Sequence, residues 1–403
     1  MKRLYEDVIE KHLREERQML FLSGPRQVGK TTTARTTAVR FGEHRYYSWD
    51  DDEARLKVVG GASRIAADMD LHRLRTAPVL AVFDEIHHFR HWRTFLKGLF
   101  DMYPAEVRIL VTGSARLDVL RKGGRGLMGR YFPYRMHPLS VAECTRPDLR
   151  EDALVGPPRA CEPELLDLLI RFGGFPEPLT RQSERFWRRW TSLRMEQLLR
   201  EDLRDLTRIQ EVGQVRVLAE LLRRSVGQQV SLASLSREVK ATITTVSRWL
   251  DALTALYYCF PVRPYSRNIP RALRKEPKYY LWDWSAVPDL GARLENLVAS
   301  ALLKACHFWS DHGLADCGLY YLRDKEKREV DFLVTVDERP FLLVEVKASA
   351  PSAIPAALNH FQAHTGAPHA LVAAFDLPFI ERDCFALGRP TVVPAATLLS
   401  QLV

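Results

Sequence analysis

The chain has 403 residues, of which 46% are hydrophobic and 27% charged, and its formal net charge at pH 7 is +9. This length exceeds what one hydrophobic core usually organises and predicts two or three domains. The scattered cysteines form no C-x-x-C pair, which argues against a zinc ribbon and a disulfide framework. No apolar run approaches the roughly 18 residues of a membrane span. We therefore expect a cytoplasmic protein without a membrane partner.

Alternating strand and helix patterns fill about the first 140 residues. Helical spacing of apolar residues marks 1–18, and a strand at 19–25 is broken by Gly24-Pro25 before a helix begins near Gly29. Further strands are expected at 44–50, 79–85 and 108–114. This order predicts an α/β fold with a parallel sheet covered by helices on both faces.

Helical periodicity dominates from residue 162 to about 256, and a second α/β region follows. Within 231–260, two short helices meet at Ala241-Thr242, which is typical of a helix-turn-helix of winged type. A Pro- and Arg-rich stretch at 261–278 precedes further strands and a helix over 294–306. The predicted domains are 1–145, a P-loop NTPase core, 146–260, a helical and winged-helix middle, and 261–403, a C-terminal α/β domain.

The segment from Gly24 to Thr31 fits the pattern G-x-x-x-x-G-K-[ST] after a strand and at the start of a helix. This predicts a cradle for the phosphates of ATP, with Lys30 on the β- and γ-phosphates and the Thr31 hydroxyl on Mg²⁺. The predicted nucleotide-binding residues are Gly24, Pro25, Arg26, Gln27, Val28, Gly29, Lys30, Thr31 and Thr32. An ordinary Gly-rich turn is the structural alternative.

Four apolar residues lead into Asp84-Glu85, so that a buried strand delivers two carboxylates at its end. We expect Asp84 to hold Mg²⁺ and Glu85 to polarise the attacking water. Ser114, or Thr112, is a candidate γ-phosphate sensor, and Arg130 is a candidate finger for a nucleotide in the same or a neighbouring subunit. A homo-oligomer would supply that neighbour. A plain turn and a surface arginine remain the alternatives.

Several segments together carry a family resemblance: GPRQVGKT, VLAVFDE, TGSA, GRYFPYRMHPLS, GGFPEP at 173–178 and REDL at 200–203. The chain resembles the prokaryotic AAA-superfamily ATPases whose core is fused to a C-terminal domain of unknown function with a restriction-endonuclease-like fold. The resemblance runs essentially from end to end. It implies an ATPase without naming a biological task.

Glu329-Val330-Asp331 and Glu345-Val346-Lys347 lie on two successive predicted strands of the C-terminal domain. They resemble the D-(x)n-E-x-K nuclease signature, which implies that Asp331 and Glu345 hold divalent metal and that Lys347 is a nuclease lysine. Glu295 on the preceding helix resembles an additional acidic ligand. A nuclease-like fold that serves only as a binding scaffold is the alternative.

DNA is a candidate partner because basic residues gather in two places. Arg237, Lys240 and Arg248 belong to the predicted helix-turn-helix, and a basic run covers 263–278. Three functions therefore remain open: an ATP-driven conformational switch acting on nucleic acid, an ATP-gated metal-dependent nuclease, and a signalling or assembly ATPase whose C-terminal domain only recruits protein. The expected cofactors are ATP and Mg²⁺.

Overall fold

A computed structural model describes residues 1–113, 126–150, 152–203, 209–266 and 276–403. These residues form two compact units, and the chain passes between them more than once. Unit 1 consists of Met1–His137 with Pro147–Leu149, and unit 2 consists of Pro138–Arg146 with Arg150–Val403. Each unit is built around its own β-sheet.

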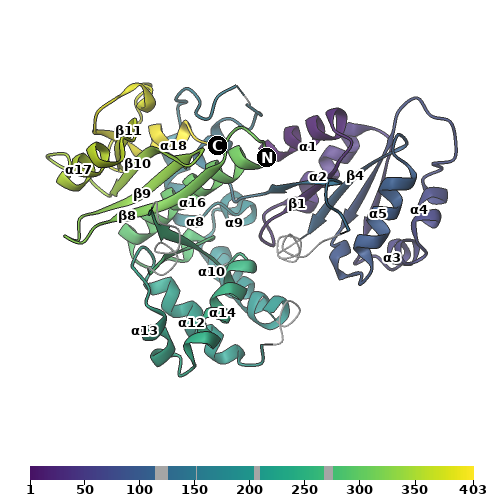
Figure 1. Cartoon of the computed structure of the whole chain (residues 1–403), viewed down its shortest axis with the longest axis horizontal. Helices are drawn as coiled ribbons and strands as arrows, with labels where there is room; N and C mark the ends of the chain where they lie inside the picture. The colour runs from purple at the N-terminus through teal and green to yellow at the C-terminus, as the bar shows by residue number, and fades with distance from the viewer. Residues whose placement is uncertain (114–125, 151, 204–208, 267–275) are drawn as a thin grey trace. The chain divides into compact units, whose positions relative to one another are not determined.

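Unit 1 contains a five-stranded sheet with strand order β2-β3-β4-β1-β5 (Figure 1). All neighbouring strands pair in parallel. The strands are β1 (Met19–Ser23), β2 (His44–Ser48), β3 (Val79–Asp84), β4 (Val107–Gly113) and β5 (Tyr131–Arg135). The predicted parallel sheet is confirmed, and β5 adds a strand that the sequence pattern did not predict.

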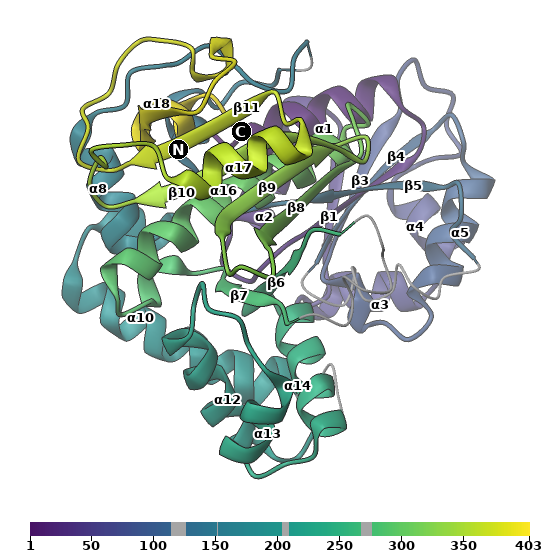
Figure 2. The ribbon, with the colours of Figure 1, turned by 60° about the vertical axis from the view of Figure 1, so that its left-hand side comes forward.

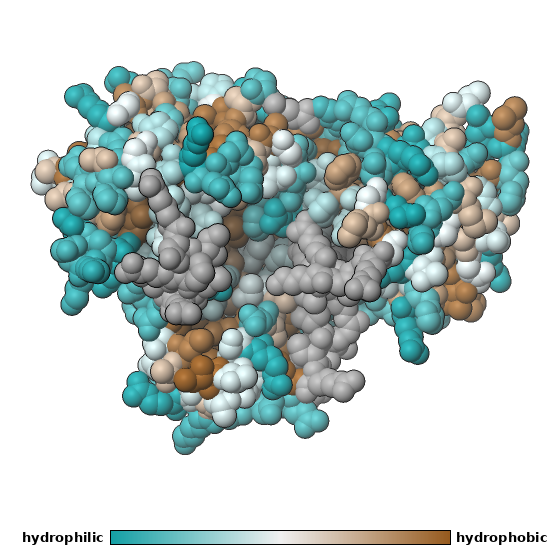
Figure 3. Space-filling model, viewed as in Figure 1, coloured by the Kyte–Doolittle hydropathy of each residue, from teal (hydrophilic) through white to brown (hydrophobic). Residues whose placement is uncertain are grey.

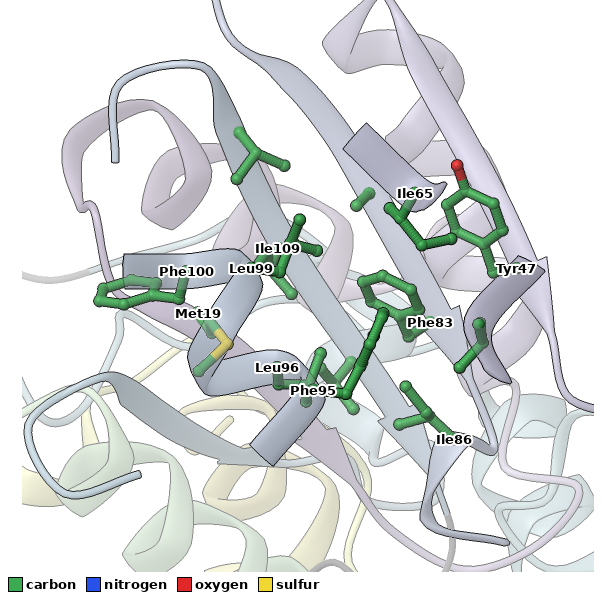
Figure 4. Close-up of a cluster of buried hydrophobic side chains, with 14 of the residues drawn as sticks. Met19, Tyr47, Ile65, Phe83, Ile86, Phe95, Leu96, Leu99, Phe100 and Ile109 are labelled. Carbon is green, nitrogen blue, oxygen red and sulfur yellow. The ribbon is translucent and has the colours of Figure 1, made fainter. Parts of the chain in front are cut away.

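Helices cover both faces of this sheet, as the buried apolar runs of β1, β3 and β4 require. The helical elements are α1 (Leu4–Glu15), α2 (Lys30–Phe41), α3 (Asp52–Val59), α4 (Ala62–Asp68), η1 (Ile86–His88) and α5 (Trp92–Met102). Figure 4 shows the core on the side of α3, α4 and α5, where Phe83 and Ile109 of the sheet meet Phe95 and Leu99. Helices α1 and α2 pack against each other, and both contact the strands. The strand ends are thereby fixed on a rigid frame.

Unit 2 begins with a helical region that confirms the predicted helical middle. Its elements are α7 (Val141–Thr145), α8 (Pro163–Phe172), α9 (Pro176–Arg181), α10 (Glu184–Gln197), the π-helical turn η3 (Leu198–Asp202), α12 (Val212–Arg224), α13 (Leu232–Glu238) and α14 (Ile243–Ala255). Helices α12, α13 and α14 lie together in Figure 2. On the face shown in Figure 3, hydrophobic residues reach the surface in small groups, one of them in this region.

A seven-stranded mixed sheet forms the rest of unit 2, with order β12-β11-β10-β9-β8-β6-β7. The strands are β6 (Cys259–Pro264), β7 (Lys278–Leu281), β8 (Cys317–Arg323), β9 (Glu329–Val336), β10 (Arg339–Lys347), β11 (His369–Ala374) and β12 (Thr391–Pro394). The helical elements are η4 (Trp284–Ala286), α16 (Leu290–Asp311), α17 (Ala356–Thr365), η5 (Cys384–Ala386) and α18 (Ala395–Ser400). The predicted boundary between residues 260 and 261 falls within β6, which pairs with both β7 and β8.

None of the described helices is both long enough and apolar enough to cross a membrane.

Candidate functional site

The loop between β1 and α2 approaches other backbone so closely that two of its positions require glycine. A Cβ at Gly24, whose φ is +154°, would lie 2.4 Å from the carbonyl oxygen of Met136. Gly29 is left-handed, with φ +105°, and is the residue from which α2 begins. A loop that runs from a strand into a helix N-terminus presents backbone N–H groups and the positive end of the helix dipole to an anion.

Lys30 is buried and bends back over this loop. Its Nζ donates hydrogen bonds to the carbonyl oxygens of Gly24, at 2.9 Å, and Pro25, at 2.8 Å. The ammonium therefore lies at the centre of the loop, where phosphate oxygens could replace the two carbonyls as its partners.

Asp84, buried at the end of β3, accepts hydrogen bonds from hydroxyl groups of three different elements. Thr31 of α2 donates to Oδ2 at 2.9 Å, Tyr46 of β2 donates to Oδ2 at 2.6 Å, and Thr112 of β4 donates to Oδ1. Burial and the nearby carboxylate raise the pKa of the Tyr46 hydroxyl, so that it stays a donor. The predicted Mg²⁺ ligands Thr31 and Asp84 are thus direct neighbours, and their hard oxygen atoms suit that ion.

Glu85 follows Asp84 in a left-handed conformation, with φ +56°, and its N–H donates to the carbonyl of Thr112. Its Oε2 lies 3.3 Å from Nε2 of the buried His87. In the described part of the chain, Glu85, His87 and His88 form the one group of three or more acidic, histidine or cysteine side chains whose ligand atoms all lie within 4.8 Å of one another. Two imidazoles and a carboxylate are a donor set for a transition metal rather than for Mg²⁺.

The other two catalytic candidates do not join this group. Arg130 makes a two-pronged ion pair with Asp101 of α5, at 2.8 and 3.0 Å. It lies just before β5, and the pairing of Met19 with Tyr131 places it at the beginning of the parallel strands, whereas the phosphate loop follows their ends. This position does not favour Arg130 as an arginine finger for a nucleotide in the phosphate loop of the same chain. Ser114 lies outside the described residues.

Two of the C-terminal candidates, Glu295 and Asp331, lie beside Lys278 of β7, a buried residue that the sequence pattern did not single out. Its Nζ lies 2.7 Å from Oε1 of Glu329, 3.5 Å from Oε1 of Glu295 and 3.9 Å from Oδ1 of Asp331. Tyr280 also donates to Oε1 of Glu295, at 2.6 Å. The cluster therefore contains a second lysine and a further carboxylate beside the predicted set.

Charge crowding in this acidic cluster changes the proton affinity of its members. Burial, together with the charges of Glu295 and Glu345, raises the pKa of Asp331 to about 8. Asp331 also accepts a hydrogen bond from the N–H of Val346, and Lys347 donates to Oε1 of Glu345 at 2.8 Å. The other carboxylate oxygen of Glu345, Oε2, is buried and accepts no hydrogen bond among the described residues. An oxygen in this state fits a cation ligand, although Lys278 already neutralises part of the cluster.

Three segments of the chain match the models of known domain families. Residues 16–145 match the model of the AAA domain family. The AAA domain therefore covers the whole candidate nucleotide site, and the chain carries a P-loop domain of AAA type. Two domains of unknown function match later segments of the chain, DUF8612 at residues 163–294 and DUF4143 at residues 290–377.

Two proteins that this chain resembles over most of its length are described as uncharacterized. An uncharacterized protein of Mycobacterium tuberculosis is 28% identical over an alignment of 356 residues, and the match covers 83% of this chain and 71% of the relative. An uncharacterized protein of Methanocaldococcus jannaschii is 23% identical over 65% of this chain and 60% of the relative. A solved Walker-type ATPase of Pyrococcus abyssi has a TM-score of 0.43 and 16% identity, and covers 71% of this chain and 94% of its own.

Sequence reasoning missed residues that hold the AAA-domain site in place. Arg3 is buried and donates to the carbonyls of Val28 in the loop, at 2.5 Å, and His137, at 2.7 Å. Tyr46 donates a hydrogen bond to Asp84, and Nε2 of His87 lies 3.3 Å from the carboxylate of Glu85. Alternation along β2 could have indicated that Tyr46 points to one face, but nothing in the sequence pairs it with Asp84.

Proposed function

We propose that this chain binds ATP with Mg²⁺ at the phosphate loop and hydrolyses it, and that the cycle drives a conformational switch acting on nucleic acid. The observation that carries the first part is the 2.9 Å hydrogen bond between Thr31 and Asp84, beside the ammonium of Lys30. The loop, Lys30 and Thr31 form one continuous stretch, and Asp84 comes from the end of β3, so two separate stretches of sequence meet at one edge of the sheet. This is the arrangement that ATP hydrolysis requires.

Each residue has a separate part in the proposed reaction. The loop backbone and Lys30 hold the phosphates, and Thr31 and Asp84 hold Mg²⁺, which supplies charge neutralisation at the phosphates when bound. Glu85 orients the attacking water and accepts its proton. His87 is placed to fix the carboxylate of Glu85 through their 3.3 Å contact.

The ATPase test compares Lys30→Ala, Glu85→Gln and the control Glu53→Gln, whose side chain is exposed on α3. We expect Glu85→Gln to bind ATP and to hydrolyse it at least about tenfold more slowly, which corresponds to about 1.4 kcal/mol of barrier. Lys30→Ala should also weaken binding. Hydrolysis by Glu85→Gln at the wild-type rate would overturn the assignment of the base.

The nucleic-acid part of the proposal is supported by three cations on α13 and α14 or in the turn between them. Arg237, Lys240 and Arg248 have no carboxylate partner within 4.0 Å in the described part of unit 2. Thr242 caps α14 by accepting from the N–H of Thr245. Short polar donors beside unpaired cations suit a phosphate backbone. The basic residues Arg271, Arg274 and Lys275 lie outside the described residues.

The matching experiment measures ATPase activity and DNA affinity of the full chain with single- and double-stranded DNA. A variant that combines Arg237→Gln, Lys240→Gln and Arg248→Gln should bind DNA more weakly. The salt dependence of its binding should also be flatter, because the lost phosphate contacts would have released counterions. DNA binding that is absent, or that ignores salt and these changes, would favour a signalling or assembly ATPase that recruits protein.

An ATP-gated metal-dependent nuclease is the second candidate, because the buried Oε2 of Glu345 has no donor in the described structure. Asp331 and Glu345 would hold the ion and Lys347 would act on the attacking water, while Lys278 neutralises the neighbouring carboxylates. Magnesium-dependent cleavage of DNA that Glu345→Ala abolishes would support this function. A melting temperature of the full chain that metal does not change, at saturating nucleotide, would contradict it.

A further inference from the structure

A cavity of about 730 Å³ opens in unit 1 away from the phosphate loop. Its lining comes from the ends of α1 and α2 and from the residues that precede or begin β2, β3 and β4. Because these strands are parallel, their beginnings form one edge of the sheet and their ends the other, which carries Lys30 and Asp84. The cavity is therefore separate from the proposed ATP site.

Positive charge dominates the lining of this cavity. It contains four arginines, Arg14, Arg73, Arg75 and Arg108, and one acidic residue, Glu43. Arg75 pairs with Glu43, and its guanidinium also donates to the carbonyls of Met69 and Asp70. Arg14 pairs with Glu10 on α1 at 2.9 Å. These two arginines are already neutralised.

Arg108 and Arg73 differ, because neither has a carboxylate within 4.0 Å in the described structure. Among the residues that the structure describes, the buried Nε of Arg108 has no acceptor, and Nη1 donates only to the carbonyl of Val107, at 3.3 Å. Burial and the neighbouring charge of Arg17 lower the pKa of Arg108. A half-buried guanidinium without a counterion, beside another cation, is destabilising unless something compensates it.

An anion is the ligand that would supply this compensation. Guanidinium groups bind phosphate through paired, charge-assisted hydrogen bonds, and Arg108 retains donors for such a bond. The volume lies within the range of small-molecule sites and exceeds what a single phosphate fills. We propose that this cavity binds a phosphate-bearing anion, with Arg108 and Arg73 as its principal contacts.

The experiment uses the full chain with Lys30→Ala, so that phosphate binding at the loop is weakened. Calorimetry measures tripolyphosphate and a short single-stranded oligonucleotide, the two sources of the same phosphate chemistry. In this background, Arg108→Met and Arg73→Gln should each weaken binding about tenfold, which is the usual size of a lost charge-assisted hydrogen bond. Arg55→Gln on α3, which removes an exposed arginine paired with Asp52, should leave binding unchanged.

Stability provides the second readout. Arg108→Met keeps the apolar stem and removes an uncompensated charge, so the melting temperature without ligand should stay the same or rise. A fall in that temperature would show that Arg108 is structural and would overturn the proposal. Binding of tripolyphosphate alone identifies a small phosphorylated ligand, and binding of the oligonucleotide identifies a nucleic-acid backbone. No binding of either, or binding that Arg108→Met leaves unchanged, refutes the site.

The test of this cavity as an anion site is independent of the ATPase assignment. If Lys30→Ala still bound ATP, the proposed nucleotide site would be wrong, whereas the dependence of tripolyphosphate binding on Arg108 would still decide whether the cavity is an anion site.

Discussion

At the scale of single residues, Asp84 is held at both carboxylate oxygens by other side chains. Hydroxyl groups from α2, β2 and β4 donate to these oxygens. If Thr31 and Asp84 held Mg²⁺ as proposed, Thr112 and Tyr46 would still donate to Asp84 and keep its carboxylate oriented. Removing one of these hydrogen bonds should therefore change how well Asp84 can act as a metal ligand.

Thr112→Val keeps the shape of the side chain and removes the donor to Oδ1 of Asp84. We expect the Mg²⁺ concentration for half-maximal ATPase activity to rise about tenfold, the lower end of the effect of losing a residue that orients a metal ligand. Thr335→Val is a matched control, because this buried strand threonine of unit 2 bonds only to the carbonyl of Gly318. An unchanged Mg²⁺ requirement would mean that Thr112 does not position Asp84.

Asp331 predicts a pH dependence of stability. Its folded pKa of about 8 lies above the ordinary carboxyl value of 3.8, so between these limits the folded state holds a proton that the unfolded state has lost. The stability it contributes is thus present at low pH and is lost as pH rises toward 8, with a slope of at most about 1.4 kcal/mol per pH unit. Burial raises the pKa of Glu295 in the same direction.

Thermal melts of metal-free protein from pH 5 to pH 8 check this expectation. Asp331→Asn keeps an acceptor for the N–H of Val346 and removes the ionisable group, so its melting temperature should fall less steeply with pH. Glu329 has the opposite shift, a lowered pKa, and contributes no slope in this window. Parallel curves for the two proteins would contradict the assignment.

At the scale of elements, the strands of unit 1 that are buried on both faces were predictable, and so was β2 despite its mixed burial pattern, whereas β5 was not predicted. All residues of β1 and β3 are buried, so their sequences are continuous apolar runs. In β5 the buried Tyr134 stands among partly exposed positions, and Pro133 further hides the pattern. The β5 strand nevertheless pairs along the whole of β1.

The candidate sites also contain residues that the sequence predicts and residues that it does not. A motif that is contiguous in sequence, such as the loop with Lys30, can be recognised from residue types alone. Tyr46, Arg3 and Lys278 act through contacts that form only when distant segments meet, and isolated residues of these types carry no signal. Lys278 even belongs to the basic run at 263–278, which the sequence pattern marks as a candidate DNA contact.

The turn from β1 into the phosphate loop gives a prediction about glycine. Gly24→Ala would place a Cβ 2.4 Å from the Met136 carbonyl, whereas Gly42, which also has a positive φ, has nothing within 4 Å. Gly42→Ala should therefore show backbone strain alone, about 1 kcal/mol. Gly24→Ala should add a clash of about 1–3 kcal/mol and weaken nucleotide binding. Urea unfolding compares the two variants, and equal losses would refute the close approach.

At the scale of the whole molecule, the chain leaves unit 1 after His137, returns for Pro147–Leu149 and then stays in unit 2. The segment 138–146 is fixed within unit 2 by Lys304 of α16. The Lys304 ammonium forms an ion pair with Glu143 and donates to Ser140 Oγ at 2.9 Å. Both charged side chains are at most 1% exposed, so neither can be compensated by water.

Lys304→Met should destabilise unit 2 by about 3–5 kcal/mol, because it leaves the buried Glu143 without its cation. Lys304→Met with Glu143→Leu should recover much of this loss, since both charges are then gone. Arg224→Met, which breaks an exposed pair with Glu220, should cost at most about 1 kcal/mol. Tryptophan fluorescence during urea unfolding measures all three, and a double variant as unstable as the single one would argue against a buried pair.

The same segment determines when unit 2 can be completed on the ribosome. Ser140 donates to the backbone oxygen of Val403, and Gly156 exchanges hydrogen bonds with Gln401. These hydrogen bonds can form only after the ribosome has synthesised about 250 further residues. At cellular elongation rates this delay is roughly 10–50 seconds. During that interval the five strands of unit 1 have already been synthesised, while residues 140 and 156 of unit 2 lack these hydrogen-bond partners and their segments stay accessible to chaperones and proteases. Synonymous codon changes that slow translation beyond residue 150 should therefore lower the yield of intact protein more than equal changes before it.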